Sequence, residues 1–178
     1  IYAVNDPFTG GTHLPDITVV TPVFAEGGAE ILFFVAARGH HADIGGIAPG
    51  SMSPKATRIE EEGVYIDPFK LVEGGRFRED AVLQLFTQGP YPARDPAQNI
   101  ADLKAQAAAN AKGVDELGKL VAQYGLGMVQ AYMGHVQDNA AASVARVIDE
   151  LEPASFEVET DTGARIKVAI DIDRARGK

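Results

Sequence analysis

Three histidines and two aspartates gather on two glycine-rich segments near the start of this 178-residue sequence. His13 and Asp16 lie three residues apart on the first segment, and His40, His41 and Asp43 follow one another closely on the second. Two imidazoles and a carboxylate, with one coordination position left open, form a metal site that can activate water or polarise a carbonyl. Because the sequence contains no cysteine, nitrogen and oxygen ligands alone would hold such a metal.

Two apolar runs separate these segments and predict how they meet. Residues 17–24 (ITVVTPVF) and 31–37 (ILFFVAA) are rich in β-branched and aromatic residues, and a glycine-containing turn joins them. In an antiparallel hairpin the start of the first strand lies beside the end of the second, so the two histidine-bearing segments should face each other. The nearly continuous apolarity also predicts that both faces of the strands are covered.

A purely structural role would also account for these residues. Asp16 and Asp43 are suited to capping turns, and the histidines could bond to backbone groups. Spacing alone therefore leaves a metal site and a structural role open. The fourth histidine, His135, lies among apolar residues of a predicted helix, where we expect a packing role.

Other catalytic and binding motifs are missing from the sequence. It contains no P-loop, no strand-linked G-x-G-x-x-G and no G-x-S-x-G, so it shows no nucleotide site and no hydrolase-type serine nucleophile. A formal net charge of −9 argues against nucleic-acid binding. No apolar run is long enough to cross a membrane and the start lacks a signal-peptide pattern, so we expect a cytoplasmic protein with no membrane partner.

A long helix predicted over residues 96–124 carries an unusual polar stripe. The stripe consists of three amides and one carboxylate at spacings of three, four and four, without lysine or glutamate. Such a composition favours a buried polar network or an interface over a solvated face, and an arginine before the helix could join it. These residues are Arg94, Asn99, Asp102, Gln106 and Asn110.

The order of the patterns predicts an α+β fold. A Gly-rich antiparallel β module precedes a long antiparallel helical hairpin, and a C-terminal β-hairpin follows. We expect one fragment, 1–178, with a metal-site β module at 1–75, a helical part at 76–151 and the β-hairpin at 152–178. Within them we expect a strand edge at 60–62, helices at 76–88 and 128–151, and strands at 156–159 and 165–171.

Five segments together resemble the hydantoinase B/5-oxoprolinase family. They are NDPFTGGTHLPDITVVTPVF, RGHHADIGGIAPGSM, IEEEGVYIDPFKL, GPYPARDPAQNIADLKAQAAAN and YMGHVQDNA, in this order along nearly the whole chain. Members of the family are several hundred residues long, so the resemblance implies that this chain is an internal fragment.

The resemblance also implies a metal-ligand set. The family motif His-x-x-Asp, followed by the histidine of Arg-x-His-x-x-Asp, corresponds to His13, Asp16 and His40. His41, Asp43 and Asp6 are then candidates for positions just behind the ligands. A further acidic ligand in the family comes from before this segment and is absent from the chain.

The family's known activity implies a division of labour. A partner subunit or domain of the hydantoinase A type binds ATP with Mg²⁺ and activates the carbonyl of a small cyclic amide by phosphorylation. The present part holds a divalent metal, Zn²⁺ or Mn²⁺, that helps water open the ring, as in 5-oxoprolinase or N-methylhydantoinase. We also expect an oligomer.

Two other functions stay open on sequence grounds. The chain could belong to an ATP-dependent carboxylase of acetone or acetophenone, which uses the same metal site on a different electrophile. It could also be a non-catalytic assembly module whose polar helix stripe forms an interface.

Overall fold

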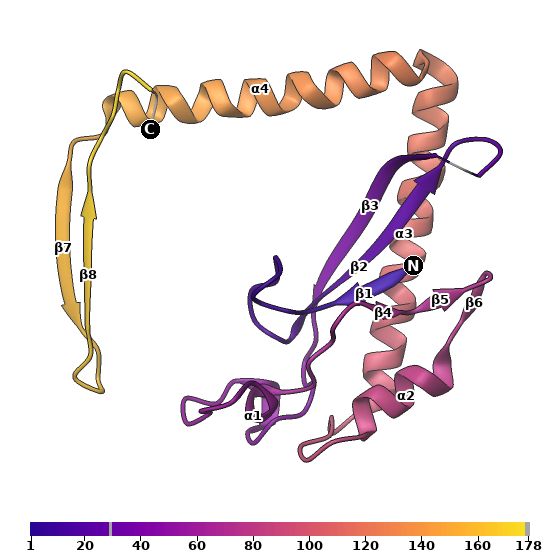
Figure 1. Cartoon of the computed structure of the whole chain (residues 1–178), viewed down its shortest axis with the longest axis horizontal. Coiled ribbons are helices and arrows are strands. Elements are labelled where there is room, and N and C mark those ends of the chain that lie inside the picture. The colour runs from indigo at the N-terminus through magenta and orange to yellow at the C-terminus, as the bar shows by residue number, and fades with distance from the viewer. Residues whose placement is uncertain (29, 177–178) are drawn as a thin grey trace. The chain divides into compact units, whose positions relative to one another are not determined.

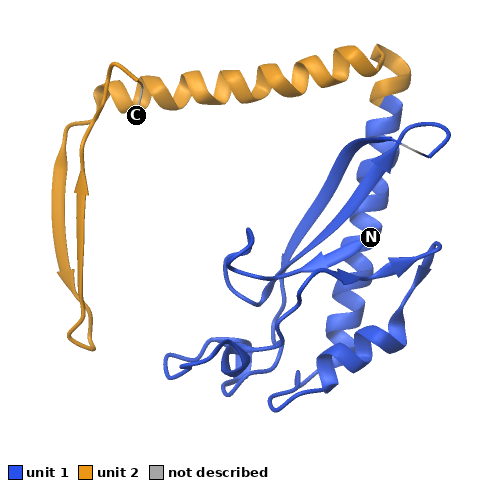
Figure 2. Ribbon diagram, in the orientation of Figure 1, with its two compact units in different colours: residues 1–119 blue, residues 120–178 orange. Residues whose placement is uncertain are grey.

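The structure is a computed structural model that describes residues 1–28 and 30–176. It divides into two compact units, residues 1–119 and 120–178 (Figure 2). The predicted α+β class is confirmed: antiparallel sheets, long helices and a C-terminal β-hairpin are all present (Figure 1). The three-part division at residues 75 and 151 stays a prediction.

A four-stranded antiparallel sheet lies at the centre of the first unit (Figure 1). Its order is β3-β2-β1-β4, and its strands are β1 (Tyr2–Val4), β2 (Asp16–Phe24), β3 (Ile31–His40) and β4 (Phe69–Lys70). The predicted hairpin is confirmed as β2 and β3. Strand β3 runs three residues beyond its expected end, because pairing with β2 continues through Gly39. This extension places His40 directly opposite Asp16.

The long helix α3 (Pro96–Tyr124) packs on one face of this sheet and has the bounds that the sequence predicts. Two glycines allow the helix to approach closely. A Cβ atom on Gly39 of β3 would lie 3.2 Å from the side-chain amide carbon of Gln106. A Cβ atom on Gly113 of α3 would lie 2.9 Å from Cγ1 of Val35, too close for an ordinary contact.

The opposite face of the sheet is not covered by other described residues of the first unit. Along β2, Ile17 and Val19 are fully buried on the α3 side, while Thr18 and Val20 on the other side are half-buried. On β3 the ring of Phe34 is 66% exposed. Within the described residues of the first unit, the prediction that both faces are covered is therefore wrong, because α3 packs on one face and no second long helix covers the other.

The core of the first unit lies between the sheet, α3 and the helix α2 (Glu79–Thr87). Its largest apolar members are fully buried, and they come from strands, loops and both helices. They are Leu14, Ile17, Val19, Ile44, Ile66, Leu71, Val82, Phe86 and Leu103.

Short elements fill the glycine-rich stretch between β3 and α2. They are a 3₁₀ turn η1 (Pro49–Ser51), the one-turn helix α1 (Ile59–Glu62) and the paired strands β5 (Val72–Glu73) and β6 (Arg76–Phe77). The strand edge expected at residues 60–62 is thus wrong, since these glutamates form α1. The helix expected from residue 76 begins at residue 79, because β6 pairs with β5 first.

The second unit holds α4 (Leu126–Glu150) and a hairpin of β7 (Ala154–Glu159) and β8 (Arg165–Ile170). Both predicted elements are confirmed within about two residues at each end. None of the unit's described residues is buried. Gly125, with φ of +81°, separates α3 from α4, and the antiparallel packing of these two helices stays a prediction. None of the described helices combines the length and apolarity needed to cross a membrane.

Candidate metal centre

Three of the predicted ligands meet at one end of the β2–β3 pair. The Nε2 atom of His13 lies 3.1 Å from Oδ1 of Asp16, and Nδ1 of His40 lies 2.9 Å from the same oxygen. The two ring nitrogens are 3.2 Å apart, and the rings meet edge to face. All three side chains are partly exposed, so a ligand from solvent can reach them.

The spacing of these atoms fits a divalent cation. With ligand bonds of about 2.1 Å, neighbouring ligand atoms lie about 3.0–3.4 Å apart in octahedral or tetrahedral coordination. The three separations here are 2.9, 3.1 and 3.2 Å. Two neutral imidazoles and one carboxylate also match the donor atoms that Zn²⁺ and Mn²⁺ accept. The His13–Asp16–His40 cluster thus offers three ligand atoms that could hold a metal ion, and it leaves further coordination positions open.

Buried Asn5 fixes the loop that carries His13. Its Nδ2 donates to the carbonyls of Leu14 and Val64, each at 2.9 Å, and its Oδ1 accepts from the amide of Ile66 at 2.7 Å. Asn5 is completely buried, so these bonds are shielded from water. The side chain thereby ties the loop that carries His13 to a segment some sixty residues further along the chain.

Asp6 takes a different position from the one expected beside the ligands. Its Oδ1 accepts from the amide of Phe8 at 2.8 Å, and its Oδ2 accepts from the hydroxyl of Thr9 at 2.7 Å. Its backbone carbonyl accepts from the amide of Gly11 at 2.8 Å. These bonds shape the turn that precedes His13, and no described bond joins the Asp6 carboxylate to the three ligands.

The surroundings of Asp16 favour its charged form and fix its orientation. Partial burial would raise its pKa, but hydrogen bonds from His40 and Thr12 and the nearby imidazoles outweigh burial and hold the pKa below its ordinary value. The hydroxyl of Thr12 donates to Oδ2 at 2.9 Å, which leaves Oδ1 directed at the two histidines. Asp16 is therefore ionised and oriented at neutral pH.

His41 turns away from the ligands and into the protein. It is 1% exposed, and its ring stacks on Phe86 with centroids 6.5 Å apart. Its Nε2 donates to Oε1 of Gln106 at 3.2 Å, and its Nδ1 accepts from Nδ2 of Asn99 at 3.1 Å. Burial lowers the pKa of His41, and the amide donor at Nδ1 fixes the neutral Nε2–H form.

The pH dependence of stability should report this buried neutral ring. Because the folded pKa of His41 lies below the unfolded value of about 6.5, its contribution is complete above pH 6.5 and is lost as the pH falls below it. Urea denaturation in the presence of a chelator should therefore show a lower free energy of unfolding at pH 5.5 than at pH 7.5, and part of that loss should come from this residue. His41→Gln, which keeps a donor and an acceptor, should have a shallower dependence, and exposed His135→Gln should match the parent. An equally steep dependence in His41→Gln would refute this assignment.

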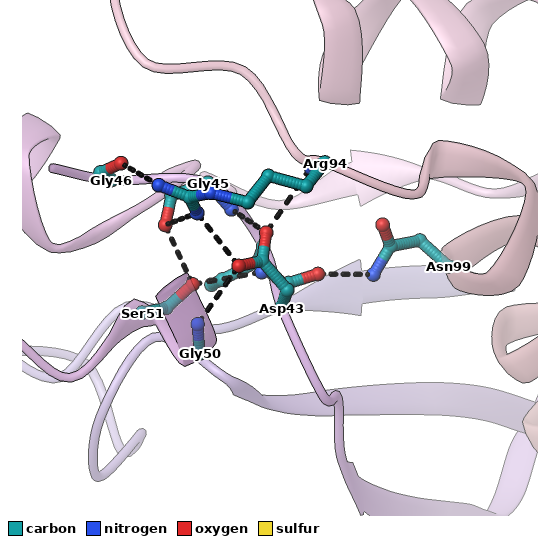
Figure 3. Close-up of polar contacts among 8 residues, drawn as sticks. Asp43, Gly45, Gly46, Gly50, Ser51, Arg94 and Asn99 are labelled. Atoms are coloured by element: carbon teal, nitrogen blue, oxygen red, sulfur yellow. Dashed lines mark hydrogen bonds and ion pairs between the residues drawn. The ribbon is translucent and has the colours of Figure 1, made fainter. Parts of the chain in front are cut away.

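Asp43 forms a separate cluster with Arg94 (Figure 3). Its Oδ1 accepts from the amides of Gly45 at 2.9 Å and Arg94 at 3.2 Å, and its Oδ2 accepts from the amide of Gly50 at 2.9 Å and from Nη1 of Arg94 at 2.7 Å. Nη2 of Arg94 donates to the carbonyl of Gly46 at 2.9 Å. Burial would raise the pKa of Asp43, but these donors outweigh it and lower the pKa. The cluster clamps the loop that follows β3.

The polar stripe of α3 contacts the sheet or the loop after β3 at three of its four positions. Nδ2 of Asn99 donates to the carbonyl of Asp43 at 2.9 Å (Figure 3). Gln106 and Asn110 donate to backbone carbonyls of β2 and β3 at 2.8–3.1 Å. Asp102 is only half-buried and instead accepts from Nε2 of Gln98 at 2.8 Å, so it does not join these contacts. The stripe connects α3 to the strands that carry the candidate ligands.

Comparisons with known proteins place this arrangement in a family. The model of "Hydantoinase B/oxoprolinase" matches residues 1–178. The chain belongs to the hydantoinase B/oxoprolinase family. It is 46% identical to a 5-oxoprolinase of Dictyostelium discoideum over 181 residues, and 42% identical to a 5-oxoprolinase of Saccharomyces cerevisiae over 184 residues. Each alignment covers 97% of this chain but 14% of the relative.

A solved structure shows the same fold for this hydantoinase B-family chain. The ATP-dependent caprolactamase from Pseudomonas jessenii superposes with a TM-score of 0.75 at 30% identity, and the match covers 97% of this chain and 30% of that one. The caprolactamase subunit beta of the same organism is 37% identical over 136 residues, which is 76% of this chain and 22% of the relative. This chain therefore corresponds to a small part of its larger relatives, and the predicted resemblance is confirmed.

Sequence reasoning missed two residues near the ligands. Thr12 orients Asp16, as described above, and Arg38 bonds to neighbouring residues on the same face of the sheet as His40. The alternation of a β-strand could have indicated Arg38, because residues two apart on a strand share a face. Thr12 belongs to an irregular loop, where no such periodicity exists.

Proposed function

We propose that this chain is the metal-bearing part of a larger ATP-dependent enzyme that hydrolyses cyclic amides, of the 5-oxoprolinase or N-methylhydantoinase type. The observation that supports this most is the cluster of His13, Asp16 and His40, whose ligand atoms lie 2.9–3.2 Å apart at an accessible end of the sheet. The names of the relatives, 5-oxoprolinase and caprolactamase, agree with a lactam as substrate.

The chain's own residues would hold and orient the reacting groups. His13, Asp16 and His40 would bind Zn²⁺ or Mn²⁺, and such an ion lowers the pKa of bound water and polarises a carbonyl. Thr12 holds Asp16 in the orientation that directs Oδ1 at the histidines. His41, buried and neutral behind this end of the sheet, adds no positive charge that would repel a cation.

The activation of the amide would come from a partner. An unactivated lactam resists hydrolysis, so we assign ATP and Mg²⁺ to a hydantoinase A-type ATPase subunit or domain that phosphorylates the carbonyl oxygen. A relative named as subunit beta of caprolactamase supports a partner of this kind. An oligomeric assembly and a cytoplasmic location remain parts of this proposal.

Turnover by the complete enzyme with its ATPase part tests the proposal. We expect L-5-oxoproline or a hydantoin to be opened by water with release of ADP and inorganic phosphate, and acetone with bicarbonate to give no carboxylated product. Carboxylation of acetone without ring opening would instead assign the ketone carboxylase function. Association with the ATPase part, but no turnover of any of these substrates and no effect of metal removal, would indicate an assembly module.

A further inference from the structure

Arg38 lies next to the candidate ligands on the open face of the sheet. It precedes His40 by two residues on β3 and pairs with Thr18 of β2, as His40 pairs with Asp16. Residues two apart on a strand point to the same face and lie about 6.6 Å apart along it. Gly39 between them faces α3, so Arg38 and His40 share the face that no described helix of the first unit covers.

The guanidinium is held in place by neutral acceptors. Nε donates to the hydroxyl of Thr18 at 2.9 Å, and Nη2 donates to the carbonyl of Gly10 at 3.0 Å. Among the residues that the structure describes, Arg38 forms no ion pair, although the chain has 25 acidic side chains. These two bonds use two of the five guanidinium donors, so three N–H groups and the full positive charge remain available.

We propose that Arg38 forms an anion-binding subsite beside the metal centre, which takes an acidic group of the substrate complex. The proposal rests on the proposed function and deepens it. A planar guanidinium binds a carboxylate or a phosphate through two parallel N–H···O bonds. The distance of about 6.6 Å between the positions of Arg38 and His40 along β3 suits a small cyclic amide. Its carbonyl would lie at the candidate ligands and its anionic group at Arg38.

The anion has two chemical sources. It is either a carboxylate on the lactam ring, as in 5-oxoproline, or the phosphoryl group placed on the activated carbonyl. Both are oxyanions that a guanidinium binds in the same way, so binding experiments must separate them.

Calorimetric titration of the complete enzyme separates these sources. The probes are L-5-oxoproline, 2-pyrrolidinone (the same ring without its carboxylate) and inorganic phosphate. For a ring carboxylate, Arg38→Gln should weaken L-5-oxoproline binding by about 10–100-fold and change 2-pyrrolidinone binding less than about twofold. For a phosphoryl group, phosphate binding should weaken instead. Arg38→Lys keeps the positive charge but cannot form two parallel hydrogen bonds, so its affinity for the anion should lie between those of the parent and Arg38→Gln. Arg76→Gln, at an exposed arginine, is the matched control.

Three results would overturn the subsite. Unchanged affinity of Arg38→Gln for both anions would do so directly. Equal weakening of 2-pyrrolidinone would show a general disturbance of the site. Loss of bound metal in Arg38→Gln, measured by elemental analysis, would show that Arg38 only positions the loop through Gly10. If the parent enzyme binds neither lactam, the proposed function fails, and the phosphate titration still decides the role of Arg38.

Discussion

Replacing both candidate histidine ligands, in the variant His13→Ala/His40→Ala, should slow lactam opening by the complete enzyme at least about a thousandfold, which is ~4 kcal/mol of transition-state stabilisation. The reason is that the variant removes both imidazoles of the cluster, whose ligand atoms lie 2.9–3.2 Å from one another. Asp16 and the acidic ligand that the family resemblance implies would then hold a divalent cation much more weakly. Turnover should be followed by the appearance of the ring-opened amino acid under saturating ATP.

The matched control for this variant is His135→Ala. His135 is exposed on α4, where its ring contacts Tyr132 rather than packing in a core, and it lies in the second unit. This control should retain the parent's rate. Ring opening by the double variant at a rate within about tenfold of the parent would show that these histidines do not carry the reaction.

Replacing Asp43 should loosen the loop that follows β3. Asp43→Ala removes the acceptor of three backbone amides and of the Arg94 guanidinium, which is only partly exposed. Leaving these donors unpaired should lower the free energy of local opening of the loop by about 2 kcal/mol, a figure that allows for the solvent access of Arg94. In hydrogen exchange of the full chain, the amides of Ile44 and Gly46, which bond to other groups, should exchange about 30-fold faster.

Asp67→Ala is the control for this prediction, because Asp67 is an exposed carboxylate in the same unit. It should leave exchange at both amides unchanged. Metal content should also stay unchanged in Asp43→Ala, since no described bond joins Asp43 to the three ligands. Parent-like exchange at Ile44 and Gly46 in Asp43→Ala would contradict the clamping role of the cluster.

Local patterns predict the regular elements of this fold well. The β-branched run of residues 17–24 gives β2, and Asp95, whose Oδ1 accepts from the amide of Gln98 at 3.1 Å, lies directly before the start of α3. The glutamates of α1 lie in a glycine-rich stretch instead, where long-range contacts decide the structure. The carbonyl of Glu61, for example, accepts from the amide of Ile47 at 2.8 Å, and nothing local encodes that bond.

Hairpin topology was enough to predict that the two histidine-bearing segments of the candidate site meet. Antiparallel pairing brings the two segments together, but only the register shows that Asp16 lies opposite His40. His40 and His41 have different surroundings because successive residues of a strand face opposite sides. His40 points to the open face, and His41 is buried against Gln106. The position of Asp43 depends on Arg94, fifty-one residues away, which spacing within the motif cannot show.

Elemental analysis of the purified complete enzyme tests the central claim most directly. If His13, Asp16 and His40 bind the metal, the parent should contain about one zinc or manganese ion per chain, and His13→Ala/His40→Ala should contain less than about a tenth of that. His135→Ala should match the parent. Equal metal content in the parent and the double variant would contradict the assignment of this cluster as the metal centre.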